Sequence, residues 1–301
     1  MSDQTLIEKL GFSSTDKVVI FHMDDVGFSH ASNVASFECL DFGVATCGSV
    51  IVPAPWFLET ASICKNNPKY DMGVHLTLTC EYDYYRWRAL STVDQKTGLL
   101  DDEGCLWSTT EEAVMHVTPE AAEKEMRAQI QRALDHGIDV THIDSHMGTV
   151  VADPKFIESY LALGSEFKIP VFMPRLTRKE IVDLGFAEYA DMYLELLPQL
   201  EANGTILMDQ IFIHTGGEQP DKLQYYCDRM AEIKPGLAHF LFHPAKMTPE
   251  LEAITPDSAI WRNQDYMAFT DKRIKDCIKK HKLKLIGYRR LRDYLRKNVY
   301  I

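Results

Sequence analysis

The chain has 301 residues and a formal net charge of −12, with 46% hydrophobic and 25% charged residues. This composition is typical of a globular protein with a sizeable core, and it excludes a disordered or fibrous chain. The excess of acidic side chains argues against nucleic acid as a partner, because binding to a phosphate backbone depends on clustered cations.

The sequence contains neither a membrane-spanning segment nor a secretory signal of the usual kind. No apolar run reaches the ~18 residues that a transmembrane helix needs, and the start "MSDQTLIEKLGFSSTDK" has no basic stretch followed by an apolar one. The seven cysteines include no CxxC pair, so a disulfide framework is not expected. These features predict a cytoplasmic protein with no membrane partner.

Short apolar or β-branched runs alternate with longer amphipathic segments, which is the pattern of βα units around a parallel sheet. Eight such runs are predicted to be strands, at residues 17–23, 47–52, 72–78, 139–143, 170–173, 209–214, 237–243 and 283–287. With no linker or repeat between them, they predict one α/β domain over 1–301 of the (β/α)-barrel type, similar to a TIM barrel. A doubly wound open sheet is the alternative.

Three intervening segments are distinctive. Residues 118–137 predict a helix with Thr118 as its N-cap and Gly137 as its stop. Residues 80–116 interrupt the alternation and predict an inserted loop or hairpin. The basic stretch 271–297 has cations at helical spacing, which indicates a solvated helix face rather than a binding patch.

Polar residues follow most of the predicted strands, and in a barrel the carboxyl ends of the strands form the active-site face. The side chains expected there are Asp24, Asp25, His75, His142, Asp144, His146, Arg175, His214 and His243.

A carboxylate and two imidazoles from three strand ends would form a facial metal site with open positions for water and substrate. The five residues 142–146, "HIDSH", hold two imidazoles and a carboxylate just past a strand. Zinc, nickel, cobalt, manganese and Fe(II) all accept such ligands. The alternatives are structural: an acidic turn or helix N-cap at Asp24 and Asp25, a core histidine at His75, and a polar loop at 142–146.

The combination of motifs resembles the YdjC-like carbohydrate deacetylase family. The matching segments are "MDDVGFSHASNVASFECLDFGVATCGSVIVPAPWF", "GVHLTLT", "HIDSH", "LFHPA" and "LIGYRRLRDYL". The resemblance implies a (β/α)-barrel-type enzyme that uses one divalent metal ion, magnesium or zinc, to remove an acetyl group from an N-acetylated sugar.

The same resemblance implies roles for individual residues. Asp25, His75 and His146 would bind the metal, Asp24 would be the general base, and His243 would be the general acid. His142 and Asp144 would support the ligands or face the substrate. Arg175 could contact substrate or an anionic group, or be a surface arginine.

The chain departs from the family pattern at two positions. "MGT" follows His146 where the family commonly has further histidines, and Val26 stands where phenylalanine is usual. The first change could alter substrate contacts. The aromatic residues Tyr82, Tyr84, Tyr85, Trp87 and Trp107 could stack on a sugar, cover the core or form a homodimer contact.

Two other functions fit the same residues. A metal-dependent sugar isomerase, epimerase or aldolase would use Asp24 or His243 to move a carbon-bound proton. A non-catalytic sugar-binding barrel would keep the fold without needing Asp24.

Overall fold

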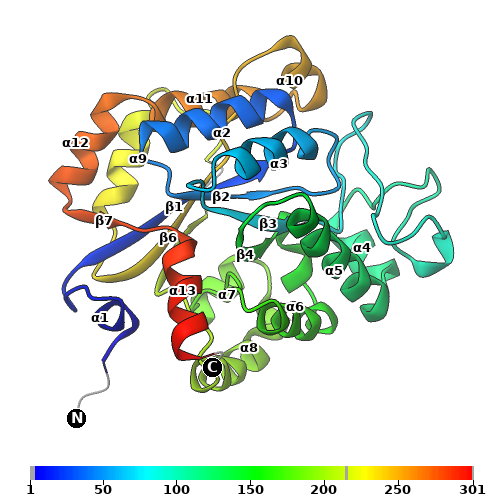
Figure 1. Cartoon of the computed structure of the whole chain (residues 1–301), viewed down its shortest axis with the longest axis horizontal. Coiled ribbons are helices and arrows are strands. Elements are labelled where there is room, and N and C mark those ends of the chain that lie inside the picture. Colours follow the sequence, from blue (N-terminus) through cyan, green and yellow to red (C-terminus); the bar gives the residue numbers. More distant parts are fainter. Residues whose placement is uncertain (1–3, 214–215, 300–301) are drawn as a thin grey trace.

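A computed structural model of the chain describes residues 4–213 and 216–299 (Figure 1). Its strands form one sheet in the order β4–β3–β2–β1–β6–β5, with β7 paired to β1. They are β1 (Lys17–Val26), β2 (Cys47–Val50), β3 (Met72–Leu76), β4 (Val140–Ser145), β5 (Gln210–Ile213), β6 (Gly236–Phe242) and β7 (Leu283–Leu285). Every strand pair is parallel, so the carboxyl ends of the strands lie at one edge.

The central strand is β1, which is buried at every position after Lys17. Such a continuous apolar run is expected where both faces of a parallel strand are covered. On one side β1 pairs with β6 over 17–23. It also pairs with β7 through 17–19 and with β2 through residues 22–26. The last strand of the chain, β7, therefore lies beside the first strand, β1, which leads to Asp24 and Asp25.

The architecture is α/β with a mostly parallel central sheet, consistent with a (β/α)-barrel-type fold. The expectation of a regular strand at 170–173 is wrong, because this segment forms only isolated bridges, Ile143 with Val171 and Pro174 with Met208. Pro170 begins the segment and Pro174 follows it, and proline has no N–H to donate to a ladder. In the sequence, the segment with these bridges lies between β4 and β5, which are the two edge strands of the regular sheet.

Helices surround the sheet, with α2, α3, α11 and α12 on one side in Figure 1 and α6, α8 and α13 on the other. The α-helices are α1 (Leu6–Lys9), α2 (His30–Phe42), α3 (Phe57–Asn66), α4 (Thr110–His116), α5 (Pro119–Asp135), α6 (Pro154–Glu166), α7 (Arg178–Asp183), α8 (Ala190–Ala202), α9 (Lys222–Ala231), α10 (Pro249–Ile254), α11 (Ala259–Phe269), α12 (Lys272–Lys280) and α13 (Tyr288–Asn298). Within the described residues, the 3₁₀ helices are η1 (Gln95–Thr97), η2 (His146–Val151) and η3 (Ala187–Tyr189).

The helix predicted at 118–137 is confirmed as α5. The Thr118 side chain accepts a hydrogen bond from the N–H of Ala121, and Pro119 occupies the first turn. Gly137 follows the helix with a φ of +87°, a left-handed conformation that glycine adopts without a steric penalty.

The insertion at 80–116 is irregular, as expected, except for η1 and α4 near its end. Its aromatic residues mostly cover the core: Tyr82 and Trp87 are buried and contact one another, whereas Tyr84 is exposed. The Trp87 indole donates a hydrogen bond to the carbonyl of Thr79. This hydrogen bond therefore holds the insertion against the residues that follow β3 in the chain.

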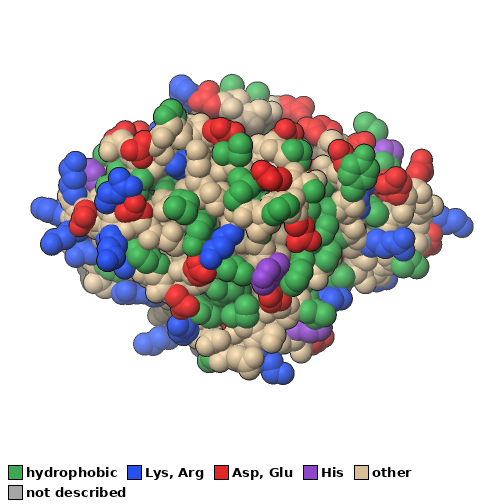
Figure 2. Space-filling model, turned by 90° about the horizontal axis from the view of Figure 1, so that it is seen from above, with side chains coloured by type: hydrophobic (Ala, Val, Ile, Leu, Met, Phe, Trp, Pro, Cys, Tyr) green, Lys and Arg blue, Asp and Glu red, His purple; other side chains and the backbone are tan. Residues whose placement is uncertain are grey.

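The basic stretch follows the prediction of a solvated helix face. In α12, Ile274 is buried while Lys272, Lys275 and Lys279 are exposed. Figure 2 shows several Lys and Arg side chains at the left end of the molecule, where α12 lies. Of the helices in the described ranges, none combines the length and the apolar character that crossing a membrane requires.

The cysteine expectation needs a correction at one pair. Cys227 of α9 and Cys277 of α12 form a disulfide, while the other five cysteines are free. The two cysteines are 50 positions apart and belong to no short motif from which a disulfide could be predicted. Its formation depends on the packing of α9 against α12.

Candidate active site

A β-bulge near the end of β1 allows the adjacent residues Asp24 and Asp25 to face the same cavity. The pairing with β2 passes from Met23–Gly48 to Val26–Val50, so β1 has one more residue than β2 between these two pairs. Asp25 has a φ of +61°, which is rare for a residue with a side chain. Gly27 also has a positive φ. Such bulges and strained residues occur where a side chain is re-aimed for function.

Asp25, His75 and His146 form a compact ligand set. The Oδ1 atom of Asp25 lies 3.4 Å from Nε2 of His75 and 3.3 Å from Nδ1 of His146. Two ligand atoms bound ~2.0 Å from one tetrahedral ion lie about 3.3 Å apart. All three side chains are buried, and Asp25 Oδ1 has no hydrogen-bond partner. An orphaned carboxylate oxygen between two imidazole nitrogens fits a bound cation.

The outer nitrogen of each imidazole contacts a carboxylate. His75 pairs with Asp144 across the β3–β4 register, and its Nδ1 lies 2.9 Å from Asp144 Oδ1. His146 begins η2, and its Nε2 lies 2.9 Å from Glu81 Oε2. Metal-binding histidines usually donate their second N–H to a carboxylate in this way, which orients the ring and fixes its tautomer.

The charges around the ligand set are predominantly negative. Burial raises the pKa of Asp25, but the Arg262 guanidinium, 2.8 Å from Asp25 Oδ2, and the nearby imidazoles of His146 and His75 hold that pKa well below its usual range. Burial lowers the pKa of His146, but Glu81 and Asp25 outweigh it and raise that pKa to about 9. The carboxylates that raise the pKa of His146 would also attract a divalent cation.

Asp24 and His243 lie beside the ligand set. Asp24 Oδ1 is 2.8 Å from Nδ1 of His22, while Oδ2 lies 3.7 Å from His75 Nε2 and 3.8 Å from His243 Nε2. His243 directly follows β6, and its backbone N–H donates to Asp265. Burial lowers the pKa of His243 to about 4. The imidazole is therefore uncharged at neutral pH.

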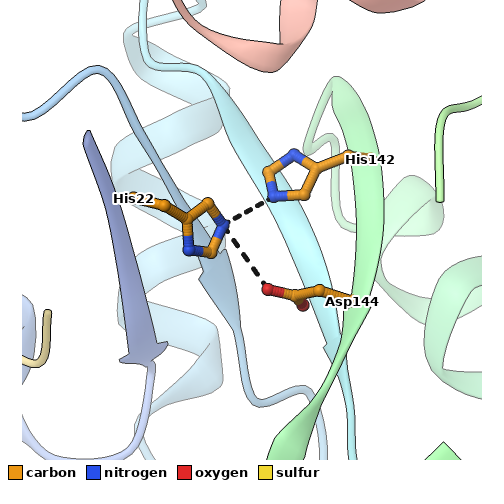
Figure 3. A group of neighbouring side chains, drawn as sticks. All are labelled: His22, His142 and Asp144. Atoms are coloured by element: carbon orange, nitrogen blue, oxygen red, sulfur yellow. Dashed lines mark hydrogen bonds and ion pairs between the residues drawn. The ribbon is translucent and has the colours of Figure 1, made fainter. Parts of the chain in front are cut away.

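A second cluster lies beneath the first and consists of His22, His142 and Asp144 (Figure 3). Its two imidazoles are hydrogen-bonded to each other, with 2.7 Å between their Nε2 atoms. That separation is shorter than the ~3.3 Å expected for two ligands of one ion. The other nitrogens contact Asp24 and the hydroxyl of Thr141. This cluster is a hydrogen-bonded network that supports Asp24 and Asp144.

The structure brings most of the predicted site residues together but not all. Arg175 lies at the surface, where it pairs with Glu201 at 3.0 Å and faces Asp209. His142 is fully buried in the second cluster and does not line the cavity. His214 lies outside the described residues.

Three residues of the site were not singled out from the sequence. Glu81 comes from the irregular insertion, where no periodicity indicates which way an acid points. Arg262 comes from α11, far along the chain from its partner Asp25. His22 does have a signal, because residues two apart on a strand share a face, which places it with Asp24.

A cavity of about 550 Å³ opens onto the ligand set. Asp24, Asp25, His75, His146 and His243 all line it. Its walls include η2, α7, η3 and α8 as well as the segment 172–176. A substrate could therefore reach the candidate ligands, the candidate base and the candidate acid from one side.

Comparison with solved structures supports the fold. A crystal structure from Enterococcus faecalis, described as a cellobiose-phosphate cleavage protein, is similar with a TM-score of 0.74 and 22% identity. The match covers 92% of this chain and 99% of that one.

Comparison with sequences identifies the family. A carbohydrate deacetylase of Thermus thermophilus is 33% identical over 275 residues, which cover 90% of this chain and 92% of the relative. A carbohydrate deacetylase of Brevibacillus brevis is 32% identical over 52% of this chain and 60% of its own length. Residues 18–280 match the family described as YdjC-like protein. The bulge, the strand-end histidines and the matched length agree, and the chain belongs to the YdjC-like family.

Proposed function

We propose that the protein is a divalent-metal-dependent hydrolase that removes the acetyl group from an N-acetylated sugar. The observation that carries the proposal is the spacing of 3.3 and 3.4 Å between Asp25 Oδ1 and the nitrogens of His146 and His75. The relatives named carbohydrate deacetylase supply the substrate class.

In this proposal Asp25, His75 and His146 hold the ion. A divalent ion there would acidify a water molecule and polarise the amide carbonyl. Asp144 and Glu81 hold the outer nitrogens of the two imidazoles, which keeps their inner nitrogens aimed at Asp25. Arg262 neutralises part of the charge on Asp25 and fixes its second oxygen.

Asp24 is the proposed general base. His22 holds Asp24 Oδ1, so that Oδ2 is the oxygen available to accept a proton from water. The cavity reaches this side chain, and a carboxylate held by one oxygen keeps a defined direction for the other.

His243 is the proposed route by which a proton reaches the leaving amine. An amine anion is a very poor leaving group, so C–N cleavage needs a proton donor. Because its pKa of about 4 leaves His243 neutral, it would receive the proton taken up by Asp24, whose Oδ2 is 3.8 Å away, and pass it on. It would not act as a standing imidazolium.

The ligand types favour zinc over magnesium within the proposal. Two of the three ligands are imidazoles, which suit zinc and other transition metals, whereas magnesium prefers an octahedral set of oxygens. Elemental analysis of protein purified without chelator would identify the ion.

The test combines metal content with acetate release from a panel of N-acetylated sugars. Asp25→Asn and His146→Ala are expected to lose stoichiometric metal and activity together. Asp24→Asn is expected to keep the metal and lose at least 100-fold in kcat, the range for a general base. The exposed Asp102→Asn, which is distant from the ligand set in sequence, is the matched control.

Two results would contradict the proposal. If no divalent ion binds under any reconstitution condition, the ligand assignment is wrong. If metal binds but no sugar of the panel releases acetate, an isomerase, epimerase, aldolase or binding protein becomes the better hypothesis. The cytoplasm remains the predicted compartment, and cell fractionation would test it.

A further inference from the structure

The lining of the cavity consists of two groups of residues of opposite character. Its charged lining side chains all belong to the candidate active site or contact it, and they are Asp24, Asp25, Glu81, Asp144 and Arg262. The thirteen lining residues between 172 and 213 include no charged side chain. Among them are Ile181, Leu184, Phe186, Met192, Leu196 and Ile213. We call these thirteen residues the apolar chamber.

The apolar chamber offers few partners to sugar hydroxyls. Its side-chain polar atoms are the hydroxyls of Tyr189 and Tyr193, and the latter already donates to the carbonyl of Pro174. A sugar ring placed there would leave most of its hydroxyls without hydrogen bonds, which is costly in a water-excluded site.

Several apolar side chains that line the cavity are also partly exposed to solvent. Met147 is 56% exposed, Ile213 43%, Leu184 42% and Met192 38%, and all four line the cavity. Apolar side chains that line a cavity and remain partly exposed are a mark of a binding site.

We propose that the apolar chamber binds an alkyl or aryl group that the substrate carries next to its scissile amide. The inference rests on the proposed function, because the amide must lie at Asp24 and Asp25 for a neighbouring group to reach the chamber. The group could be an acyl chain longer than acetyl or an apolar aglycone of the sugar, since both present the same chemistry to these walls.

The experiment compares three substrates of the metal-loaded protein: N-acetylglucosamine, N-octanoylglucosamine and the octyl glycoside of N-acetylglucosamine. The free amine is measured after each reaction. Each methylene that becomes buried is expected to lower KM about fourfold, so even a partly buried octyl group should lower KM at least tenfold. The substrate that gains shows whether the chamber takes the acyl chain or the aglycone.

Variants locate the effect. Met192→Gln and Leu184→Gln are expected to reduce the preference for the octyl substrate at least fivefold, and this ratio cancels a general loss of activity. Met267→Gln is the matched control, because Met267 is 59% exposed and does not line the cavity. Equal KM values for all three substrates would overturn the inference.

A binding measurement separates this inference from the proposed function. Calorimetry of the same compounds with Asp24→Asn tests the chamber without turnover. Tight octyl binding to Asp24→Asn, combined with no hydrolysis of any substrate by the metal-loaded wild type, would retain the chamber and reject the deacetylase. Hydrolysis of the acetyl sugar without octyl binding would do the reverse. A dimer that Met192→Gln dissociates, with no octyl binding, would instead assign the chamber's opening to a second copy of the chain.

Discussion

Asp265 is a fully buried acid whose protonation is coupled to folding. Burial raises its pKa from 3.8 to about 6, although Lys222 and the Tyr226 hydroxyl partly offset the effect. Since the folded protein binds this proton more tightly than an unfolded chain, Asp265 contributes stability below about pH 4 that is lost as the pH rises through 6. The difference corresponds to about 3 kcal/mol in the free energy of unfolding.

Asp265→Asn removes this titration. Between pH 4 and pH 7 the free energy of unfolding of the wild type should fall by about 2.4 kcal/mol relative to that of the variant. Urea unfolding at several pH values would measure the difference. The exposed Asp257→Asn should run parallel to the wild type, and a parallel curve for Asp265→Asn would disprove the coupling.

At the scale of the residue, the sequence predicts which side chains form the site better than it predicts how the backbone orients them. Asp24, Asp25, His75 and His146 could be chosen because strand ends of a parallel sheet meet. The left-handed backbone of Asp25 could not be predicted, because it depends on the pairing of β1 with β2.

At the scale of the element, the insertion behind β3 supplies part of the candidate metal site. Glu81 Oε2 lies 2.9 Å from His146 Nε2, so Glu81→Gln should leave the fold intact and weaken metal binding by 10-fold to 100-fold, as for other partners of ligating histidines. Competition with a chromogenic chelator would measure the affinity. Glu103→Gln, in the same insertion but paired with Arg86, should bind metal like the wild type.

The disulfide between α9 and α12 is the second element-scale feature. Closing a loop across 50 positions should stabilise the fold by about 2 to 4 kcal/mol. The double variant Cys227→Ser, Cys277→Ser should lose that amount in chemical denaturation, and reductant should then have no further effect. Cys105→Ser, a free cysteine, is the control. If the protein is cytoplasmic, the reducing environment would favour the less stable dithiol form.

Elements with strong local signals were predictable and those that depend on neighbours were not. Thr118, Pro119 and Gly137 mark both ends of α5 within its own sequence. The segment 170–173 has the composition of a strand, but Pro170 and Pro174 leave it only isolated bridges. The Cys227–Cys277 bond requires two helices to pack first.

At the scale of the whole molecule, the candidate ligands join three strand ends, β1, β3 and β4. An ion bound only to the folded protein stabilises it by about 2.7 kcal/mol at a concentration 100 times its Kd. For a chain of this length that predicts a rise in Tm of roughly 5 °C. Thermal unfolding with zinc and with chelator would show it. Asp25→Asn should not respond, and an equal response would place the ion elsewhere.

The network beneath the candidate active site runs through the sheet from Asp24 to Asp71. With Asp71 ionised, the Thr141 hydroxyl donates to it at 2.5 Å, so the Thr141 oxygen must accept from Nδ1 of His142. Burial lowers the pKa of His142 well below its usual range, so its ring is neutral and its Nε2 accepts from His22 Nε2.

One hydrogen is then still needed between Nδ1 of His22 and Oδ1 of Asp24, which lie 2.8 Å apart. That hydrogen makes either His22 a cation or Asp24 an acid. The ionised state of Asp71 sets the direction of each hydrogen bond in this network. It therefore fixes the number of protons that Asp24 and His22 share at the opposite end of the strands.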